Sequence, residues 1–226
     1  MDRAFIFDVF GTCVDWRGSV ARGVAEALPE VDAWAFADAW RGEYQPAMEA
    51  IRSGGRGYVP LDVLHLENLE RVAARLGVTL EDAAGLNRVW EQLDPWPDVV
   101  PGLTRLRAHG LIAPCSNGST AMMVRLARHG GLPWDTIVGA DVARDYKPQA
   151  SVYLASAAAL GLAPHTVTMV AAHNDDLVAA RAAGLKTAFV VRPTEHGPGQ
   201  AADLVPSEDW DFVAQDFLEL AELVAE

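Results

Sequence analysis

Residues 5–12 read FIFDVFGT, so a carboxylate, Asp8, directly follows an apolar run and a Gly-Thr turn closes behind it. Residues 4–9, AFIFDV, are nearly all apolar, which is typical of a strand covered on both faces in a parallel sheet. A carboxylate that ends such a strand serves as a nucleophile, a metal ligand or a cap. This stretch alone leaves the three alternatives open.

Strands and helices alternate regularly after residue 102. Strands that alternate with helices at this spacing form right-handed crossover units, so the pattern predicts a parallel sheet. The predicted strands are residues 111–117, 136–141, 166–172 and 186–191, and the predicted helices are residues 102–110, 120–130, 150–161, 176–184 and 211–225.

The segment from about residue 18 to residue 92 has a different character. Its apolar residues recur at helical spacing, and no convincing strand lies between the helical stretches. The segment that follows, DPWPDVVPG at 94–102, has three prolines in nine residues and is predicted to be an exit linker. The sequence therefore predicts an α/β protein with a helical block inserted after the first strand.

The charge balance limits the choice of partners. The chain of 226 residues has 31 acidic and 18 basic residues, a formal net charge of -13, and no concentrated basic patch. Such a charge repels nucleic acid and anionic membranes. A small anionic substrate is still compatible with it, because a few buried cationic side chains outweigh a distant surface field that salt screens.

The two cysteines and the N-terminus point to a reducing compartment. Cys13 and Cys115 have neither metal-ligand spacing nor a disulfide framework. The N-terminus lacks the sections of a signal peptide, and no uncharged apolar run reaches eighteen residues. We therefore expect a globular cytoplasmic protein with no membrane partner.

Several polar side chains follow predicted strand ends. Asp8 follows the first strand, Ser116 and Asn117 end the second, and the acidic segment AAHNDD at 171–176 follows a later one. Because parallel sheets bind ligands at the carboxyl ends of their strands, we expect these side chains to converge on one crevice.

Each of these signals is weak when taken singly. Asn117 reads as a turn residue, Lys147 in DYKP as a solvated lysine, and Asp176 as a carboxylate facing a helix N-terminus. Their order along the chain is more specific. The order is DVFGT at 8–12, a helical insertion, SNG at 116–118, a lysine before proline and then the acidic turn. In this order the motifs resemble the haloacid dehalogenase superfamily, and within it the 2-haloacid dehalogenases.

The resemblance covers essentially the whole chain and implies both a fold and a nucleophile. The implied fold is a Rossmann-like parallel sheet core, residues 1–15 and 96–226, with an α-helical cap domain at 16–95 that closes over the site. In this superfamily the aspartate matched by Asp8 is a covalent nucleophile. Most relatives are magnesium-dependent phosphatases, so the resemblance to the fold alone does not decide the chemistry.

Two positions depart from the phosphatase pattern. Phosphatases place a second aspartate two residues after the nucleophile as a general acid, and this chain has Phe10 there. They also place a magnesium ligand where this chain has Ala172, and an alanine methyl offers Mg²⁺ no oxygen. A departing halide needs no proton, so the prediction is a dehalogenase with no metal and no cofactor. Asp175 and Asp176 still offer oxygen, so a phosphatase is kept as the alternative.

The remaining roles are carried over from the family by position. The resemblance implies that Arg41 and Asn117 contact substrate and halide, that Lys147 supports Asp8, and that Asp176 lies near the hydrolytic water. The other implied assignments are Thr12 as a hydrogen-bond donor to the nucleophile, Ser116 on the substrate carboxylate, Tyr153 bracing the lysine, and Phe10 with Tyr58 and Leu61 as the wall of the halogen pocket.

The last motif departs from the dehalogenase pattern. The family often has a serine where this chain has Ala171. We therefore expect His173 or Asn174 to position the water in place of the missing serine, and the sequence does not decide between them.

The sequence predicts hydrolysis of haloacetate or short L-2-haloalkanoates to 2-hydroxy acids through an aspartyl ester on Asp8. The nearest alternative is an Mg²⁺-dependent phosphatase of small metabolites. A receiver-like signalling module and a catalytically dead binding protein are more distant alternatives. A homodimer is plausible because the helical block carries many large apolar residues, although these equally suit a core of its own.

Overall fold

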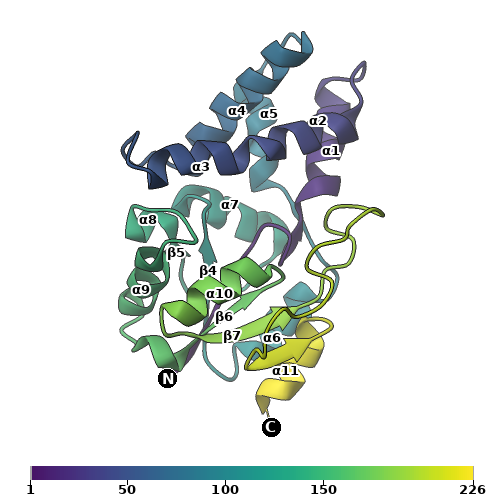
Figure 1. Cartoon of the computed structure of the whole chain (residues 1–226). Helices are drawn as coiled ribbons and strands as arrows, with labels where there is room; N and C mark the ends of the chain where they lie inside the picture. The colour runs from purple at the N-terminus through teal and green to yellow at the C-terminus, as the bar shows by residue number, and fades with distance from the viewer. Residues whose placement is uncertain (1, 226) are drawn as a thin grey trace.

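The computed structural model describes residues 2–225 and has a parallel sheet at its centre (Figure 1). Each neighbouring pair of strands in this sheet runs parallel, and β1 lies between β4 and β6. The order across the sheet is β5 (Val138–Gly139), β4 (Leu111–Ser116), β1 (Ala4–Phe7), β6 (Val167–Ala171), β7 (Lys186–Val190) and β8 (Phe212–Ala214).

The strand β1 is buried on both faces, as its apolar sequence predicts. Phe5 and Phe7 pack into the cluster beneath α6 (Val99–Leu106), α7 (Thr120–Gly130) and α11 (Phe217–Ala225). The alternate residues of β1 face the other way, because successive side chains of a strand point to opposite faces.

Ala4 and Ile6 belong to a second apolar cluster, on the opposite face of the sheet from Phe5 and Phe7. It is covered by α9 (Ala150–Ala159) and α10 (Asn174–Ala182). Helices thus cover both faces of the sheet, and the predicted fold class, an α/β core with a helical insertion, is confirmed. The short elements α8 (Ala140–Ala143) and η2 (Pro164–Thr166) complete the connections.

A block of helices lies above the carboxyl ends of the strands, on the side opposite to both termini (Figure 1). Its aromatic and aliphatic core is continuous with the cluster on one face of the sheet. The block consists of α1 (Trp16–Ala27), α2 (Ala33–Gly42), α3 (Tyr44–Arg52), α4 (Leu61–Leu76), α5 (Ala83–Asn87) and η1 (Arg88–Glu91).

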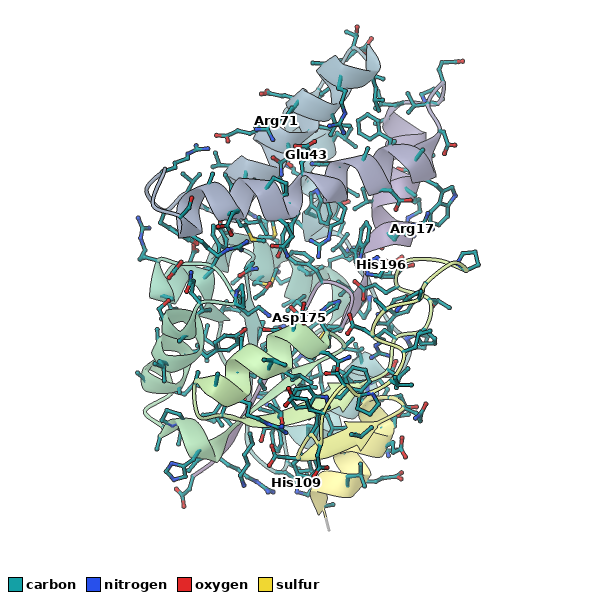
Figure 2. The ribbon with its side chains drawn as sticks, in the orientation of Figure 1. Arg17, Glu43, Arg71, His109, Asp175 and His196 are labelled. Carbon is teal, nitrogen blue, oxygen red and sulfur yellow. The ribbon has the colours of Figure 1, made fainter. Side chains whose placement is uncertain are left out.

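An ion-pair cluster joins two helices within this block. Glu43, between α2 and α3, accepts from Arg71 at 3.0 Å and from Arg75 at 2.5 Å, and Figure 2 shows Glu43 beside Arg71. Helical periodicity in the sequence runs through residues 33–51 without a break, but α2 ends at Gly42 and α3 begins at Tyr44. The cluster fixes this bend against α4.

The chain leaves and re-enters the core through a two-stranded antiparallel ribbon. Val14 of β2 (Val14–Asp15) pairs with Pro95 of β3 (Asp94–Pro95), and Trp96 N donates to Cys13 O at 3.0 Å. We propose that this ribbon is the junction between a core of residues 1–15 and 96–226 and a cap of residues 16–95.

Two local predictions are wrong. Residues 211–225 do not form one helix, because Phe212–Ala214 add the edge strand β8 beside β7 and α11 begins only at Phe217. The proline-rich segment 94–102 is not only a linker: it contains β3 and the start of α6. Pro101 is compatible with helix there because it lies in the first turn, where an N–H has no intrahelical partner.

Within residues 2–225, no helix combines the length and the apolar character that crossing a lipid bilayer requires.

Candidate active site

The turn after β1 holds Asp8 at the carboxyl end of the sheet. Its backbone N–H donates to Val170 O of the neighbouring strand at 2.9 Å, so the strand pairing continues one residue past β1. Thr12 Oγ1 donates to Asp8 Oδ2 at 2.8 Å and accepts from Ala172 N at 2.9 Å. Asp8 is 7% exposed, so the fold presents a nearly dry carboxylate in one fixed orientation.

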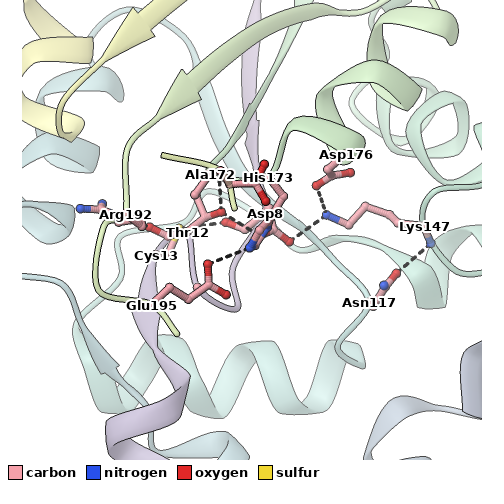
Figure 3. A network of polar contacts seen from close by, with 12 residues as sticks. Asp8, Thr12, Cys13, Asn117, Lys147, Ala172, His173, Asp176, Arg192 and Glu195 are labelled. Atoms are coloured by element: carbon pink, nitrogen blue, oxygen red, sulfur yellow. Dashed lines mark hydrogen bonds and ion pairs between the residues drawn. The ribbon is translucent and has the colours of Figure 1, made fainter. Parts of the chain in front are cut away.

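Lys147 lies between two carboxylates (Figure 3). Its Nζ is 2.8 Å from Asp8 Oδ1 and 2.5 Å from Asp176 Oδ2. The Lys147 N–H donates to Asn117 Oδ1 at 2.8 Å, which fixes the lysine backbone to the end of β4. Parallel strands therefore bring together side chains that are far apart in the sequence.

The charges of this cluster follow from its contacts. Burial alone would raise the pKa of Asp8, but the ammonium of Lys147 and the imidazole of His173 outweigh burial, and the pKa lies well below its usual value. Burial would lower the pKa of Lys147, whereas the carboxylates of Asp176 and Asp8 raise it above its usual value. Asp8 is therefore an anion and Lys147 a cation throughout the neutral range.

His173 links Asp8 to a carboxylate that sequence reasoning missed. His173 Nδ1 is 3.1 Å from Asp8 Oδ2, and its Nε2 is 2.9 Å from Glu195 Oε2. Burial would lower the pKa of His173, but Glu195 and Asp8 outweigh burial and raise the pKa well above 6.5. His173 is thus an imidazolium that donates from both nitrogens.

A cavity of about 650 Å³ opens on this cluster, between the helical block and the sheet. Asp175 and His196, labelled in Figure 2, lie between the two parts of the molecule and belong to its lining. Most predicted site residues also border it, namely Asp8, Phe10, Arg41, Asn117, Lys147, His173 and Asp176. A second cavity, about 840 Å³, lies within the helical block between α1 and α5, away from Asp8.

Arg41 extends from α2 over the aromatic wall of the cavity. Its Cζ lies 3.8 Å from the ring centroid of Tyr44, 5.3 Å from Trp16 and 5.7 Å from Phe10. Its Nη1 is buried and has no hydrogen-bond partner among residues 2–225. A stacked guanidinium with a free buried donor beside a cavity is suited to bind an anion.

Asn117 and Tyr44 form the adjoining part of the wall. Asn117 Nδ2 donates to Tyr44 Oη at 3.1 Å, while Asn117 Oδ1 accepts from the Lys147 backbone. Tyr44 was not among the predicted site residues, because a tyrosine at the start of a helix usually serves packing. Its place in the site follows from the contact between α3 and the end of β4.

Two other predicted residues lie behind the cavity lining. Ser116 is fully buried, and its Oγ accepts from Gly118 N at 3.0 Å. Tyr153 is also fully buried and donates its hydroxyl proton to Asp176 Oδ1. Burial and Asp176 raise the pKa of Tyr153 far above its usual value, so the phenol stays neutral. Both side chains support the residues that do reach the cavity.

Asn174, expected as an alternative to His173, points away from the cavity. Its Nδ2 donates to Asp203 Oδ1 at 2.8 Å and to Val205 O at 3.1 Å. Its Oδ1 accepts from Ser207 N at 2.8 Å and from Trp210 Nε1 at 3.1 Å. Asn174 therefore anchors the segment that follows β7, and of the two alternatives only His173 contacts Asp8.

The expected halogen wall also differs in detail. Tyr58 donates to Asp141 Oδ1 at 2.6 Å, Leu61 is fully buried, and neither borders the cavity. Phe10 does border it, and Tyr44 and Arg41 occupy the positions beside Phe10.

The donor set does not suit a magnesium ion at Asp8. Both of its carboxylate oxygens already accept from Lys147, Thr12 and His173, and Ala172 presents a buried methyl group. Mg²⁺ requires several oxygen ligands in octahedral geometry. His173, Glu195 and His196 place one donor atom each within 4.8 Å of one another, but the first two are already paired with each other.

Comparisons with known proteins agree with this geometry. A sequence model of the family described as haloacid dehalogenase-like hydrolase matches residues 3–184. Among curated proteins, the chain is 26% identical over 234 residues to (S)-2-haloacid dehalogenase 4A of Burkholderia cepacia, a match that covers 97% of this chain and 98% of that protein.

Solved structures give closer matches. A defluorinating L-2-haloacid dehalogenase is 48% identical with a TM-score of 0.97, over 100% of this chain and 96% of that chain. The L-2-haloacid dehalogenase of Xanthobacter autotrophicus with chloropropionic acid covalently bound is 25% identical with a TM-score of 0.84, over 100% of this chain and 99% of that chain.

Proposed function

Because this chain belongs to the haloacid dehalogenase-like hydrolase family, we infer that it is a hydrolase of carbon–halogen bonds that converts short 2-haloacids to 2-hydroxy acids. The observation that carries this function is an ionised Asp8 on a cavity in which the residue two positions after it is Phe10 and not an aspartate. The covalent chloropropionic acid bound to one relative supports the same chemistry.

The first step is a displacement at carbon. A carboxylate oxygen of Asp8 attacks C2 of the substrate from the side opposite the halogen, and the C–X electron pair leaves with the halide. An ester bond forms on Asp8 and the carbon is inverted. No proton moves in this step, so an apolar Phe10 beside the nucleophile costs nothing, whereas an alkoxide leaving group would need an acid there.

Cationic donors offset the approach of an anionic substrate to an anionic nucleophile. Lys147 is held between Asp8 and Asp176, at 2.8 Å and 2.5 Å, so its positive charge stays beside the nucleophile. Arg41 has a free donor beside the cavity, and Asn117 lies next to it. We assign Arg41 and Asn117 to the halide and the substrate carboxylate, which they hold while closure of the helical block excludes water.

The second step is hydrolysis of the ester. Water attacks the carbonyl carbon of the Asp8 ester, and the bond between that carbon and the ester oxygen breaks. The hydroxy acid leaves with the ester oxygen, and Asp8 is again a carboxylate. Asp176 and His173 border the cavity beside Asp8, His173 through its contact with Asp8 and Asp176 through Lys147. Positioning contributes much of the acceleration, since a carboxylate is a weak nucleophile in water and a better one when dry and aligned.

Halide release from chloroacetate in the presence of EDTA tests this function. We expect turnover by the wild type without added metal and none by Asp8→Ala. Phosphate release from a small phosphate monoester that requires Mg²⁺, without halide release in EDTA, would instead favour the phosphatase alternative.

We also propose a reducing cytoplasm as the location and a homodimer as the assembly. Cys13 and Cys115 are buried free thiols, which is compatible with a reducing compartment. Trp34 on α2 is 51% exposed, and this large apolar side chain supports a contact between copies. Sedimentation equilibrium over a range of protein concentrations tests the assembly.

A further inference from the structure

Glu195 is a buried carboxylate to which the proposed reaction gives no role. It is 1% exposed, and it lies in the segment after β7. Trp16 Nε1 donates to its Oε1 at 3.0 Å, and His173 Nε2 donates to its Oε2 at 2.9 Å. Burial would raise the pKa of Glu195, but His173 outweighs burial and lowers the pKa, so the carboxylate stays ionised.

The carboxylate of Glu195 is packed against the nucleophile turn. Gly11 has φ +88°, and a Cβ built on it would lie 2.1 Å from Glu195 Oε1. Only glycine leaves room for this approach. Glu195 is therefore packed against Gly11. Its Oε1 faces Trp16 and, at 3.5 Å, His196 Nε2, and its Oε2 faces His173.

The other groups near Asp8 are less suited to accept a proton from water. Lys147 is a cation and has no lone pair. Both oxygens of Asp176 are engaged, one with Lys147 and the other with Tyr153. In contrast, the Nδ1 of His173 has one partner among residues 2–225, which is Asp8 itself. This contact changes when Asp8 becomes an ester.

We propose that Glu195 is a positioning residue that, through His173, activates the water of the second step. This inference rests on the proposed function. Glu195 keeps the imidazole oriented with Nε2–H toward itself and Nδ1 toward the ester. The arrangement is a carboxylate–imidazole pair that acts on a water molecule beside the ester carbon.

The proton balance of this step closes. Ester formation removes the negative charge of Asp8, so the Nδ1 proton of His173 is lost to solvent through the cavity, and the Nδ1 lone pair becomes free. Water then gives a proton to Nδ1 while its oxygen bonds to the ester carbon. When the tetrahedral intermediate collapses, the leaving alkoxide takes the hydroxyl proton of that intermediate. The products are the hydroxy acid, ionised Asp8 and the imidazolium of the resting state.

Glu195→Gln tests the proposal because it keeps the shape of the side chain and removes its charge. With chloroacetate we expect about one halide per site to be released rapidly, followed by turnover at least about tenfold slower than in the wild type, since general-base catalysis contributes about 10²–10⁴-fold. Intact mass spectrometry should then find the carboxymethyl ester on Asp8. Turnover that falls without ester accumulation, or that does not fall, would overturn the proposal.

Glu208→Gln is the matched control. Glu208 lies in the same segment and pairs with Arg181 at 3.0 Å, exposed and outside the cavity. The same chemical change there should leave halide release and ester lifetime unchanged. Ester accumulation in this variant would show that loosening the segment is sufficient, and it would overturn the assignment to Glu195.

The pH dependence of ester hydrolysis distinguishes activation from mere packing. The groups that face His173 are Glu195 and Asp8. His196 contacts Glu195 Oε1 at 3.5 Å. The other charged groups that border the same cavity are Arg41, Arg52, Lys147, Asp175, Asp176 and Asp203. Without the charge of Glu195 the imidazolium of His173 is less stable. In Glu195→Gln, the pH range over which the rate of ester hydrolysis rises should therefore shift to lower pH. Glu195→Asp, which keeps the charge, should restore this range toward the wild-type position. An unshifted range would assign Glu195 a packing role and overturn the proposal.

Failure of this inference differs from failure of the proposed function. If the wild type releases no halide and no ester on Asp8 is trapped in any variant, the proposed function fails. If the wild type releases halide but Glu195→Gln accumulates no ester, only the role of Glu195 fails.

Discussion

Lys147 Nζ lies 2.8 Å from Asp8 Oδ1, although 139 positions separate the two residues in the sequence. Against the effect of burial, the ammonium of Lys147 lowers the pKa of Asp8 and so stabilises the ionised nucleophile. The lysine is itself stabilised by a second carboxylate, Asp176. Removing one member of the cluster therefore has predictable consequences for the others.

Lys147→Met should leave Asp176 without its cation and Asp8 with the imidazolium of His173 as its remaining cationic partner. An uncompensated buried charge costs about 3–5 kcal/mol, so we expect a lower free energy of unfolding and a raised pKa of Asp8. Loss of a preorganised charge at such a site costs roughly 10²–10³-fold in rate. Halide release and chemical unfolding measure both effects. Wild-type activity in this variant would contradict the role of the lysine.

Arg41→Lys keeps the charge of the cap residue but removes its planar donor fork. A hydrogen bond to a charged group contributes about 1.5–3 kcal/mol, so kcat/KM for chloroacetate should fall by roughly 10–100-fold. The stacking on Tyr44 is also lost. Arg56→Lys is a suitable control because Arg56 pairs with Glu67 on the exposed surface of the helical block. Equal kcat/KM in Arg41→Lys and the wild type would remove Arg41 from the anion site.

His173 should contribute a stability that depends on pH. Its pKa in the folded protein is raised above the ordinary value of 6.5 by Glu195 and Asp8, against the effect of burial. The stabilisation is then fully present below about pH 6.5 and is lost as the pH rises through the folded value. The difference in free energy of unfolding between wild type and His173→Asn should shrink from pH 6 to pH 9. A difference that grew with pH would contradict the charge assignment.

Arg192 should hold the segment after β7 to the nucleophile turn. It makes a two-point ion pair with Asp98 at 2.8 Å, and its Nε donates to Thr12 O at 2.8 Å. Breaking one partner of a buried ion pair costs about 3–5 kcal/mol. We therefore expect Arg192→Met to unfold at clearly lower denaturant concentration. Removal of both partners in Arg192→Met with Asp98→Leu should cost less than the sum of the single variants.

The parallel sheet and the placement of its site could be predicted from the sequence, because strand ends of a parallel sheet meet at one edge. That rule alone brings Asp8, Asn117 and Asp176 to the same crevice. The edge strand β8 was missed because its three residues continue the apolar pattern of α11. Pairing with β7, a tertiary contact, decided their conformation.

Glu195 and Tyr44 were missed for a different reason. Glu195 lies in TEHGPG, a segment with glycine and proline and no periodicity, where sequence patterns give no position for a side chain. Its importance follows only from the approach of this segment to Gly11 and His173. Conversely, Asn174 had a plausible chemical type but is committed to Asp203 and Trp210.

A single turnover in ¹⁸O-labelled water, with enzyme in excess over chloroacetate, tests the covalent role of Asp8 most directly. Water attacks the ester carbon in this account, so the label should enter the Asp8 carboxylate and the glycolate formed should be unlabelled. Peptide mass spectrometry of the segment that contains Asp8 reads the result. Label that appears in glycolate and not on Asp8 would contradict the account.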